Sequence, residues 1–494
     1  MSYLELLKLA APETIVVITA LVVLIVDLTS MPDLEPRVRF SIGGMIAGVG
    51  SAAAIVWMVI VQPQGHLPGG MLVADPLNAL VKMVVLVMTI FTVLLSIDAK
   101  FTTHVGEYLA LVLFAAVGMM FLVSAEDVLM IFVALEMTSL SLYILTAFNK
   151  RNLKSAEAAL KYFLFGGMAA AFMLFGLSLL YGLSGSTNLG EIAAALKGRG
   201  LDPLLVVAIV MTVIGFGFKV AAVPFHLWAP DAYEGAPTPS AAFIASGSKV
   251  ASFFIFAKVM MIGFAGAEGS AAWRGYASGW MPVIAVVAGL SMVLGNLAAI
   301  VQSDVKRLLA YSAIAHAGYA LLGIVSHNAS GTAALIYYVA TYGLTVVGAF
   351  GVVGVVENFT GAAKLSDFAG LSRRAPVVSV CMMVFMLSLA GIPPLAGFFG
   401  KFYVFLAAVG AGKSLGLLWL VILAVAMSAV SLYYYLLVLK QVFVTDAPAG
   451  AGEIRVSLVT QIALALLALG VVLLGCFPGW LVGVIEHAMT PVGH

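Results

Sequence analysis

Long apolar stretches dominate this chain and constrain its fold more than any other feature. Apolar residues (AVILMFWYC) make up 63% of its 494 residues, and charged residues only 10%. A soluble core stops growing at about 250–300 residues, so this much apolar sequence cannot be one soluble interior. A window of about 20 residues, the length of a helix that crosses a bilayer, gives fourteen candidate spans. The sequence therefore predicts an all-α polytopic membrane protein.

Short loops separate the spans, and no shift in composition marks a soluble domain. We therefore expect a single membrane domain over residues 1–494. The predicted spans are 11–30, 40–61, 76–97, 107–124, 127–148, 157–182, 204–222, 239–262, 279–300, 307–325, 332–356, 377–409, 415–439 and 457–480.

Charge and cysteine content exclude several classes of function. Lys and Arg number 24 against 23 Asp and Glu, a net charge of +1, which leaves no basic surface for nucleic acid. The two cysteines, Cys381 and Cys476, cannot ligate an iron–sulfur cluster, which needs about four thiolates. No glycine-rich nucleotide-binding motif is present. We expect no cofactor or metal in this chain.

Cations are distributed unevenly between alternate loops, and this sets the expected orientation, because cytoplasmic loops carry an excess of Lys and Arg. One set of loops holds thirteen cations: Arg37, Arg39, Lys100, Lys150, Arg151, Lys154, Lys306, Arg307, Lys364, Arg373, Arg374, Lys440 and Arg455. The other set holds five: Lys8, Lys197, Arg199, Arg274 and Lys413. We expect the thirteen-cation side to be cytoplasmic, which places both termini outside.

Six lysines remain inside the spans: Lys82, Lys161, Lys219, Lys249, Lys258 and Lys401, with Glu136 the clearest acidic residue at mid-span. A lysine at a helix centre costs about 2.5–3.5 kcal/mol. Lys82 and Lys258 lie near span ends, and we interpret them as extending their ammonium groups to the interface. The others are candidates for function, because ionisable groups inside a membrane mark ion pathways.

Proline interrupts two of the spans. Pro224 follows Lys219 by five residues in the seventh span, and Pro393 and Pro394 precede Lys401 in the twelfth. Proline removes a backbone donor and clashes with the preceding turn, so each helix must break. Broken backbone at membrane depth survives only where protein or water satisfies its polar groups.

The two breaks indicate an internal repeat, because interrupted helices at matching positions of two halves are typical of inverted-repeat transporters. Spans 4–8 and 9–13 form two five-helix units with the break in the fourth helix of each. We expect N-terminal helices at 1–106, a first inverted repeat at 107–262, a second at 279–440 and a last helix at 441–494. A simple kink would be the alternative explanation for one interrupted helix. Two interrupted helices, each beside a buried lysine, favour the inverted repeat.

Several segments of the chain are specific enough to suggest a family. They are SAEDVLMIFVALEMTSLSLYIL, GFGFKVAAVPFHLWAPDAYEGAPTP, SGSKVASF, KRLLAYSAIAHAGYALLGI and SLAGIPPLAGFFGKF. Through them the chain resembles, over about residues 11–480, the antiporter-like membrane subunits of respiratory complex I, the NADH-quinone oxidoreductase. Lys401 in the twelfth helix and the short segment after the last span favour the subunit N branch over the subunit M and L branches.

The resemblance implies proton translocation driven by electron transfer from NADH to quinone in other subunits. The residues it implies for this task are Glu136, Lys161, Lys219, Lys249 and Lys401. It places FMN, iron–sulfur clusters and quinone in partner subunits, names subunits M, K, J and A as neighbours, and implies a bacterial inner membrane as the location.

The chemistry of these residues suggests how protons would move between them. Desolvation lowers the pKa of a buried lysine, and a nearby carboxylate raises it. We therefore expect Glu136 and Lys219, together with Lys161, to switch between paired and separated states. On separation Lys219 would pass a proton to Lys249, with His316 as a candidate relay and Lys401 as the last donor.

Some assignments stay open at this point. His226, beside the Pro224 break, is either an anchor for the interrupted segment or part of the proton path, and His316 is either a relay or a packing residue. Tyr433, Tyr434 and Tyr435 are interpreted as interfacial or packing aromatics. A subunit of a multisubunit cation/proton antiporter is the alternative function. A structural membrane spacer is a third reading, which the intramembrane lysines argue against.

Overall fold

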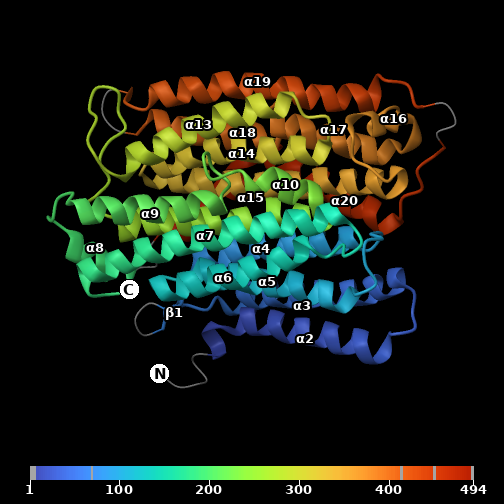
Figure 1. Ribbon diagram of the computed structural model, residues 1–494, viewed down its shortest axis with the longest axis horizontal. Helices are drawn as coiled ribbons and strands as arrows, with labels where there is room; N and C mark the ends of the chain where they lie inside the picture. The colour runs from blue at the N-terminus through green and yellow to red at the C-terminus, as the bar shows by residue number, and fades with distance from the viewer. Residues whose placement is uncertain (1–6, 68–70, 412–414, 449–451, 491–494) are drawn as a thin grey trace.

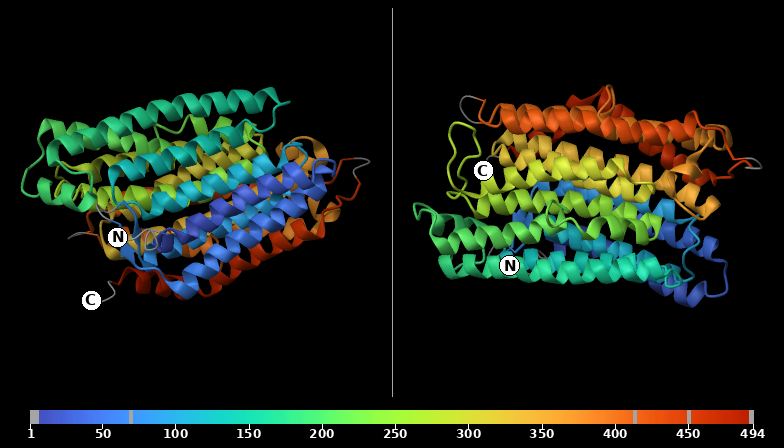
Figure 2. Two further views of the ribbon diagram at one scale, coloured as in Figure 1. Left: turned by 90° about the horizontal axis from the view of Figure 1, so that it is seen from below. Right: turned by 45° about the horizontal axis from the view of Figure 1, so that its top comes forward.

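The computed structural model describes residues 7–67, 71–411, 415–448 and 452–490. Lys413, one of the five cations expected on the outer side, lies outside these residues. The helices run alongside one another in a single bundle, with α2 and α3 at one edge and α19 at the opposite edge (Figures 1 and 2).

The first half of the described chain comprises α2 (Ala11–Ser30), α3 (Pro36–Val61), β1 (Gly65–His66), β2 (Val73–Ala74), α4 (Pro76–Ser96), α5 (Val105–Ser124), α6 (Val128–Thr146), α7 (Leu153–Ser184), α8 (Leu189–Leu196), α9 (Pro203–Lys219), α10 (Trp228–Gly235), α11 (Thr238–Ala245), α12 (Gly247–Lys258) and the π-helix η2 (Val259–Gly263). The second half comprises α13 (Trp280–Ile300), α14 (Val305–Val325), α15 (Ala329–Thr360), the 3₁₀-helix η3 (Leu365–Phe368), α16 (Leu371–Arg374), α17 (Pro376–Ala390), α18 (Ala396–Val409), α19 (Leu418–Phe443), α20 (Leu458–Cys476) and α21 (Pro478–Met489).

Within the described residues, twelve helical segments are long and apolar enough to cross a membrane. Three more apolar helices, α9, α17 and α18, are shorter because they belong to the two interrupted spans. The all-α membrane fold is thus confirmed, including the breaks in the seventh and twelfth predicted spans. The total of fourteen spans stays a prediction.

The structure adds elements that hydropathy does not reveal. β1 and β2 pair as a two-residue antiparallel ladder in the loop before α4. Within the last predicted span, α20 ends at Cys476 and Pro478 begins the additional helix α21, because proline is favoured at the first position of a helix. The eighth predicted span is divided between α11 and α12 at Ser246.

Close helix packing depends on small residues. α13 and α14 form one of the tightest pairs, and a Cβ placed on Gly295 would lie only 2.5 Å from the backbone nitrogen of Ala315. Glycine is therefore required where these two backbones meet, as is common between membrane helices.

The entrances of α6 and α14 are built alike. Asp127 accepts from the backbone N–H groups at the start of α6, and Asp304 does the same for α14. The next residue of each helix donates its backbone N–H to a distant carbonyl at 2.8 Å: Val128 to Thr187, and Val305 to Ala363. A helix of 32 residues follows in each case, α7 after α6 and α15 after α14.

Candidate functional site

The break between α9 and α10 is held by side chains that satisfy the freed backbone. Pro224 lies in this break. Just before it, the Val223 N–H donates to Ser291 Oγ of α13 at 2.9 Å, and Trp228 Nε1 donates to the Phe218 carbonyl at 2.9 Å. The interruption is thus tied both to its own helix and to the second half of the chain.

The break between α17 and α18 contains Pro393, and the backbone changes direction at a glycine. Gly391 ends α17 with φ 87°, a conformation that favours glycine. Across the break, the Gly397 N–H donates to Ser388 Oγ at 3.1 Å.

Lys401 lies one turn into α18 and reaches back to the end of α17. Its Nζ donates to the carbonyls of Leu389 and Ala390, both at 3.0 Å, and to Ser428 Oγ of α19 at 2.9 Å. These carbonyls are the free, partly negative end of α17, so they suit an ammonium group. Lys401 also lines a pocket of about 310 Å³ that opens between α18 and α19.

Lys219 is the last residue of α9, and its Nζ contacts Ser139 Oγ of α6. Glu136 lies one turn before Ser139, and its Oε1 has no hydrogen-bond partner among the described residues. No ion pair joins Glu136 to Lys219 in the described chain. The predicted pair is therefore separated in this structure, and its switching stays a prediction.

Lys161 lies elsewhere than the sequence led us to expect. Its side chain is 41% exposed and pairs with Asp231 of α10 at 2.8 Å and with Glu157 at 2.7 Å. α7 presents one face outward, with Leu160 and Leu164 exposed beside Lys161. Lys161 consequently belongs to an ion-pair group at the edge of the bundle rather than to the buried surroundings of Lys219.

Lys249, on α12, is 2% exposed. Its Nζ donates to the Ala313 carbonyl of α14 at 2.6 Å and lies 5.9 Å from the centre of the Tyr342 ring. Among the residues that the structure describes, this ammonium group has one hydrogen bond and no ion pair, and an unpaired charge is costly to bury.

His316 lies between Lys249 and Lys401 in a series of contacts with tyrosine side chains. Its ring lies 4.8 Å from the ring of Tyr342, and its Nδ1 and Nε2 contact the hydroxyls of Tyr338 at 2.7 Å and Tyr435 at 3.1 Å. Tyr319, beside His316, places its ring centre 5.1 Å from Lys401 Nζ.

Tyr434 and Tyr435 pack inside the bundle, which is one of the two roles interpreted for these tyrosines from the sequence. Both are fully buried, and only Tyr433 faces outward, at 56% exposed. Tyr435 contacts Ser312 Oγ at 2.5 Å as well as His316, and Tyr434 donates to Asn296 Oδ1 at 2.9 Å. A pair of tyrosines inside a predicted span was the only available signal, since their partners come from distant helices.

A small cavity of about 10 Å³ lies beside His316, next to the break before α18. Tyr338, Thr341, Thr345 and Ser388 are among the residues that line it.

Lys82 and Lys258 do not belong to this series of buried groups. Each forms an ion pair with a carboxylate instead of extending to the interface. Lys82 Nζ lies 2.6 Å from Glu13, and both side chains are less than 10% exposed. Lys258 Nζ lies 3.0 Å from Glu126. The acidic partners lie on other helices, so spacing along the sequence could not reveal them.

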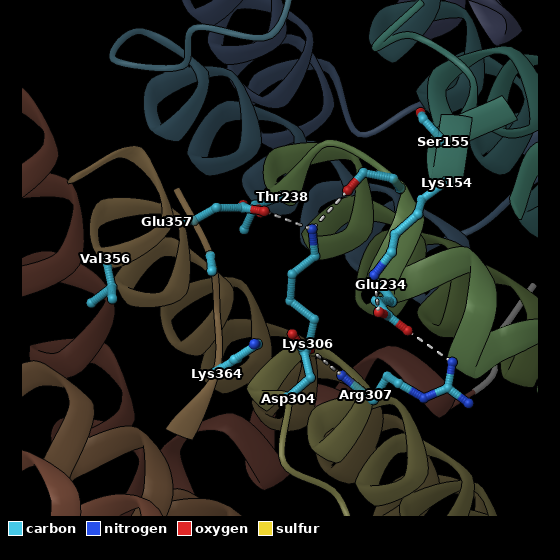
Figure 3. A network of polar contacts seen from close by, with 12 residues as sticks. Lys154, Ser155, Glu234, Thr238, Asp304, Lys306, Arg307, Val356, Glu357 and Lys364 are labelled. Carbon is cyan, nitrogen blue, oxygen red and sulfur yellow. Dashed lines mark hydrogen bonds and ion pairs between the residues drawn. The ribbon is translucent and has the colours of Figure 1, made fainter. Parts of the chain in front are cut away.

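A polar network that the sequence did not predict joins the first break to the second half of the chain (Figure 3). Lys306 of α14 donates to the Ala236 carbonyl at 2.9 Å and pairs with Glu357 of α15 at 3.3 Å. Glu357 also accepts from the Thr238 hydroxyl.

The neighbouring cation extends this network to α10. Arg307 contacts Asp231 at 2.7 Å and Glu234 at 2.8 Å, and Lys154 pairs with Glu234 at 3.1 Å. Because Asp231 also binds Lys161, α10 is bound by cations from both α7 and α14.

No group of three or more His, Cys, Asp or Glu side chains that could hold a metal ion occurs among the described residues.

The arrangement can be compared with known proteins. Residues 125–431 match the family described as NADH:quinone oxidoreductase/Mrp antiporter, transmembrane. NADH-quinone oxidoreductase subunit N 2 of Acidobacterium capsulatum is 53% identical to this chain, covering 97% of it and 98% of that protein. The chain belongs to this family, in its subunit N group. The subunit N of Chloroflexus aggregans is 38% identical, over 99% of this chain and 98% of its own length.

Solved structures agree with membership of this family. A chain of respiratory complex I from Thermus thermophilus is 34% identical, with a TM-score of 0.78, and the match covers 96% of this chain and 98% of that one. A chain of the Mrp complex from Dietzia sp. has a TM-score of 0.81 over 99% of this chain and 97% of its own, but only 20% identity. The Mrp likeness therefore shows the fold alone.

Proposed function

We propose that this subunit of NADH-quinone oxidoreductase translocates protons through a chain formed by Glu136, Lys219, Lys249, His316 and Lys401. The observation that carries the proposal is the series of contacts from Lys249 through Tyr342 and His316 to Lys401, which crosses from the first half of the molecule to the second. Buried ionisable groups in series are what a proton path through a membrane requires.

The proton moves between groups that differ in how they stabilise charge. Lys219 holds a proton best when Glu136 approaches it, and Ser139 is its neutral partner when they separate. Separation favours transfer to Lys249, and His316 with one water carries the proton towards Lys401. Lys161 acts at the edge, where its pairing with Asp231 and Glu157 sets the position of α10. Pro224 and Pro393 provide the two breaks at which the helices can move.

Two inverted repeats, at 107–262 and 279–440, underlie this arrangement in our proposal. The matched entrances of α6 and α14, capped by Asp127 and Asp304, support it, as does the 32-residue helix that follows each. The flanking segments, 1–106 and 441–494, add the N-terminal helices and α20.

We further propose how the protein is oriented in the membrane and which subunits lie beside it. The thirteen-cation side faces the cytoplasm of a bacterial cell, and both termini lie on the periplasmic side of its inner membrane. Subunits M, K, J and A are the proposed neighbours, and FMN, iron–sulfur clusters and quinone belong to partner subunits. A cation/proton antiporter subunit remains the alternative, but 53% identity to a subunit N favours complex I.

Proton pumping by the reconstituted complex tests the proposal. Lys219→Ala is expected to abolish pumping by this subunit while the complex still assembles and oxidises NADH. Glu136→Gln is expected to slow it, because Lys219 loses its charged partner. Full pumping by an assembled Lys219→Ala complex would contradict the assignment.

A further inference from the structure

A cavity of about 830 Å³ opens at the cation-rich end of the molecule. It lies among the loops before α3, α5, α7 and α20 and the last turns of α15. This is the end of the bundle where α2 passes into α3, on the right in Figure 1. Its walls are therefore formed where membrane-spanning helices begin or end, which is the level at which lipid head groups lie.

Positive charge predominates in the lining of this cavity, which we call the basic cavity. Five Lys and Arg residues line it against two acids, Glu35 and Asp98, an excess of three positive charges. The five cations, all from the thirteen-cation set, are Arg37, Lys100, Lys150, Arg151 and Arg455. Charges of one sign gathered in a concave surface attract ions of the opposite sign.

Asp98 does not neutralise most of these cations, because its carboxylate is already engaged. It pairs with Arg37 at 3.1 Å and accepts from the Thr460 hydroxyl at 2.7 Å and from the Ser457 hydroxyl. Four cations have no ion-pair partner among the described residues: Lys100, Lys150, Arg151 and Arg455. They share the basic cavity with one unpaired acid, Glu35, so the cavity is suited to an anion from outside the chain.

The floor of the basic cavity is apolar. Ile97, Phe148 and Ile454 line it and are each less than 10% exposed, whereas all five cations are exposed. Exposed cations above buried apolar side chains fit an amphiphile, whose anionic group meets the cations while its hydrocarbon covers the floor. A free inorganic anion would leave the floor uncovered, and a neutral lipid would leave the cations unpaired.

Size and surroundings also fit a lipid. Sites for small molecules measure about 300–1,000 Å³, and the basic cavity lies within this range. Exposed apolar side chains continue from it along the helices: Phe359 lines the cavity, Val38 follows Arg37, and Leu458 follows Ser457. Acyl chains can therefore extend from the cavity over an apolar surface into the bilayer.

We propose that the basic cavity binds the phosphate group of an anionic phospholipid, with part of its hydrocarbon against the apolar floor. The lipid joins parts of the chain that are far apart in sequence, since the walls come from the N-terminal helices, the loop between α6 and α7, the end of α15 and the segment before α20. The site is independent of the proposed proton path, because none of the residues of that path lines it.

Photo-crosslinking in the intact complex tests the proposal. The photoreactive residue p-benzoylphenylalanine replaces Phe359, which is 50% exposed at the basic cavity. The complex is reconstituted in vesicles that contain phosphatidylglycerol and phosphatidylcholine in equal amounts, and the adducts are identified by mass spectrometry. We expect adducts with phosphatidylglycerol to exceed those with phosphatidylcholine at least severalfold. Equal amounts of the two adducts, or crosslinking to a neighbouring subunit in place of lipid, would overturn the proposal.

Matched lysine variants show whether the cations of the cavity cause this preference. In the same crosslinking chain, Lys100→Gln, Lys150→Gln should remove most of the preference for phosphatidylglycerol, because each cation near an anionic lipid strengthens its binding. Lys364→Gln, Lys440→Gln is the control, since both are exposed lysines of the thirteen-cation set outside the basic cavity. All variants are compared as assembled complexes that oxidise NADH. Equal preferences in the two double variants would contradict a site built by Lys100 and Lys150.

Competition separates a lipid from a free phosphate compound. Short-chain phosphatidylglycerol should displace the crosslinked lipid, whereas glycerol phosphate, which has the anionic group without hydrocarbon, should do so at least about tenfold less effectively, because it leaves the apolar floor uncovered. Equal competition by the two compounds would show that the cavity binds free anions, and the lipid proposal would fail.

Discussion

The buried lysines differ in what surrounds the ammonium group. Lys401 donates to the free carbonyl end of α17, whereas Lys249 donates to a single carbonyl inside α14. Lys219 contacts the hydroxyl of Ser139 and lies 5.8 Å from the centre of the Tyr143 ring. The three ammonium groups therefore have different surroundings along the proposed path, and only Lys401 donates to the partly negative carbonyl end of a helix.

Two neighbouring tyrosines allow a sharp test of the His316 relay. Tyr435→Phe removes the hydroxyl that contacts His316 and Ser312, and we expect the pumping rate to fall severalfold while assembly is unchanged. Tyr433→Phe, on the outward face of the same helix turn, should have no effect. Equal rates for the two variants, measured in reconstituted vesicles, would remove Tyr435 from the path.

The pair of Glu13 and Lys82 makes a prediction about stability. Lys82→Met leaves a buried carboxylate without its partner, and the complex should be destabilised by about 3–5 kcal/mol. The double variant Glu13→Gln, Lys82→Met removes both charges and should recover most of the loss. Thermal unfolding of the purified complex measures both, and a double variant no more stable than the single one would contradict a direct pairing.

At the scale of elements, the two breaks are where structure and function meet. Each places a lysine at a helix end: Lys219 closes α9, and Lys401 binds the last carbonyls of α17. A movement of either short helix changes the surroundings of its lysine directly.

Gly391 tests this coupling at the second break. A Cβ on Gly391 would lie 3.1 Å from Lys401 Cδ, so Gly391→Ala should displace Lys401 and lower pumping. Gly361→Ala is the matched control: its φ of 79° carries similar strain, about 1–2 kcal/mol, but nothing lies within 4 Å. Pumping assays of both variants separate strain from displacement, and equal losses would show that Lys401 does not depend on Gly391.

Hydropathy and proline could predict most of the elements, because each depends on local sequence. Contacts between distant helices could not be predicted in this way. Lys161 looked buried because its span is apolar, yet its partner Asp231 draws it to the edge of the bundle. Tyr435 and Arg307 gain their importance from residues more than 70 positions away.

At the scale of the whole molecule, the cation-rich end holds a cavity of about 830 Å³, a smaller one of about 310 Å³ and the network around Lys306. Orientation in the membrane then decides from which side protons enter. Lys364→Cys should react with an impermeant maleimide from the cytoplasmic side, and Arg274→Cys from the periplasmic side. The reverse pattern would invert the orientation and the direction of the path.

Every proton that follows the proposed path passes through Lys249. The most direct test is the number of protons moved per NADH oxidised by the intact complex carrying Lys249→Met, compared with Lys258→Met on the same helix, whose ammonium pairs with Glu126. We predict that this ratio falls for Lys249→Met and is unchanged for Lys258→Met, with both complexes fully assembled. An unchanged ratio for Lys249→Met would contradict the account.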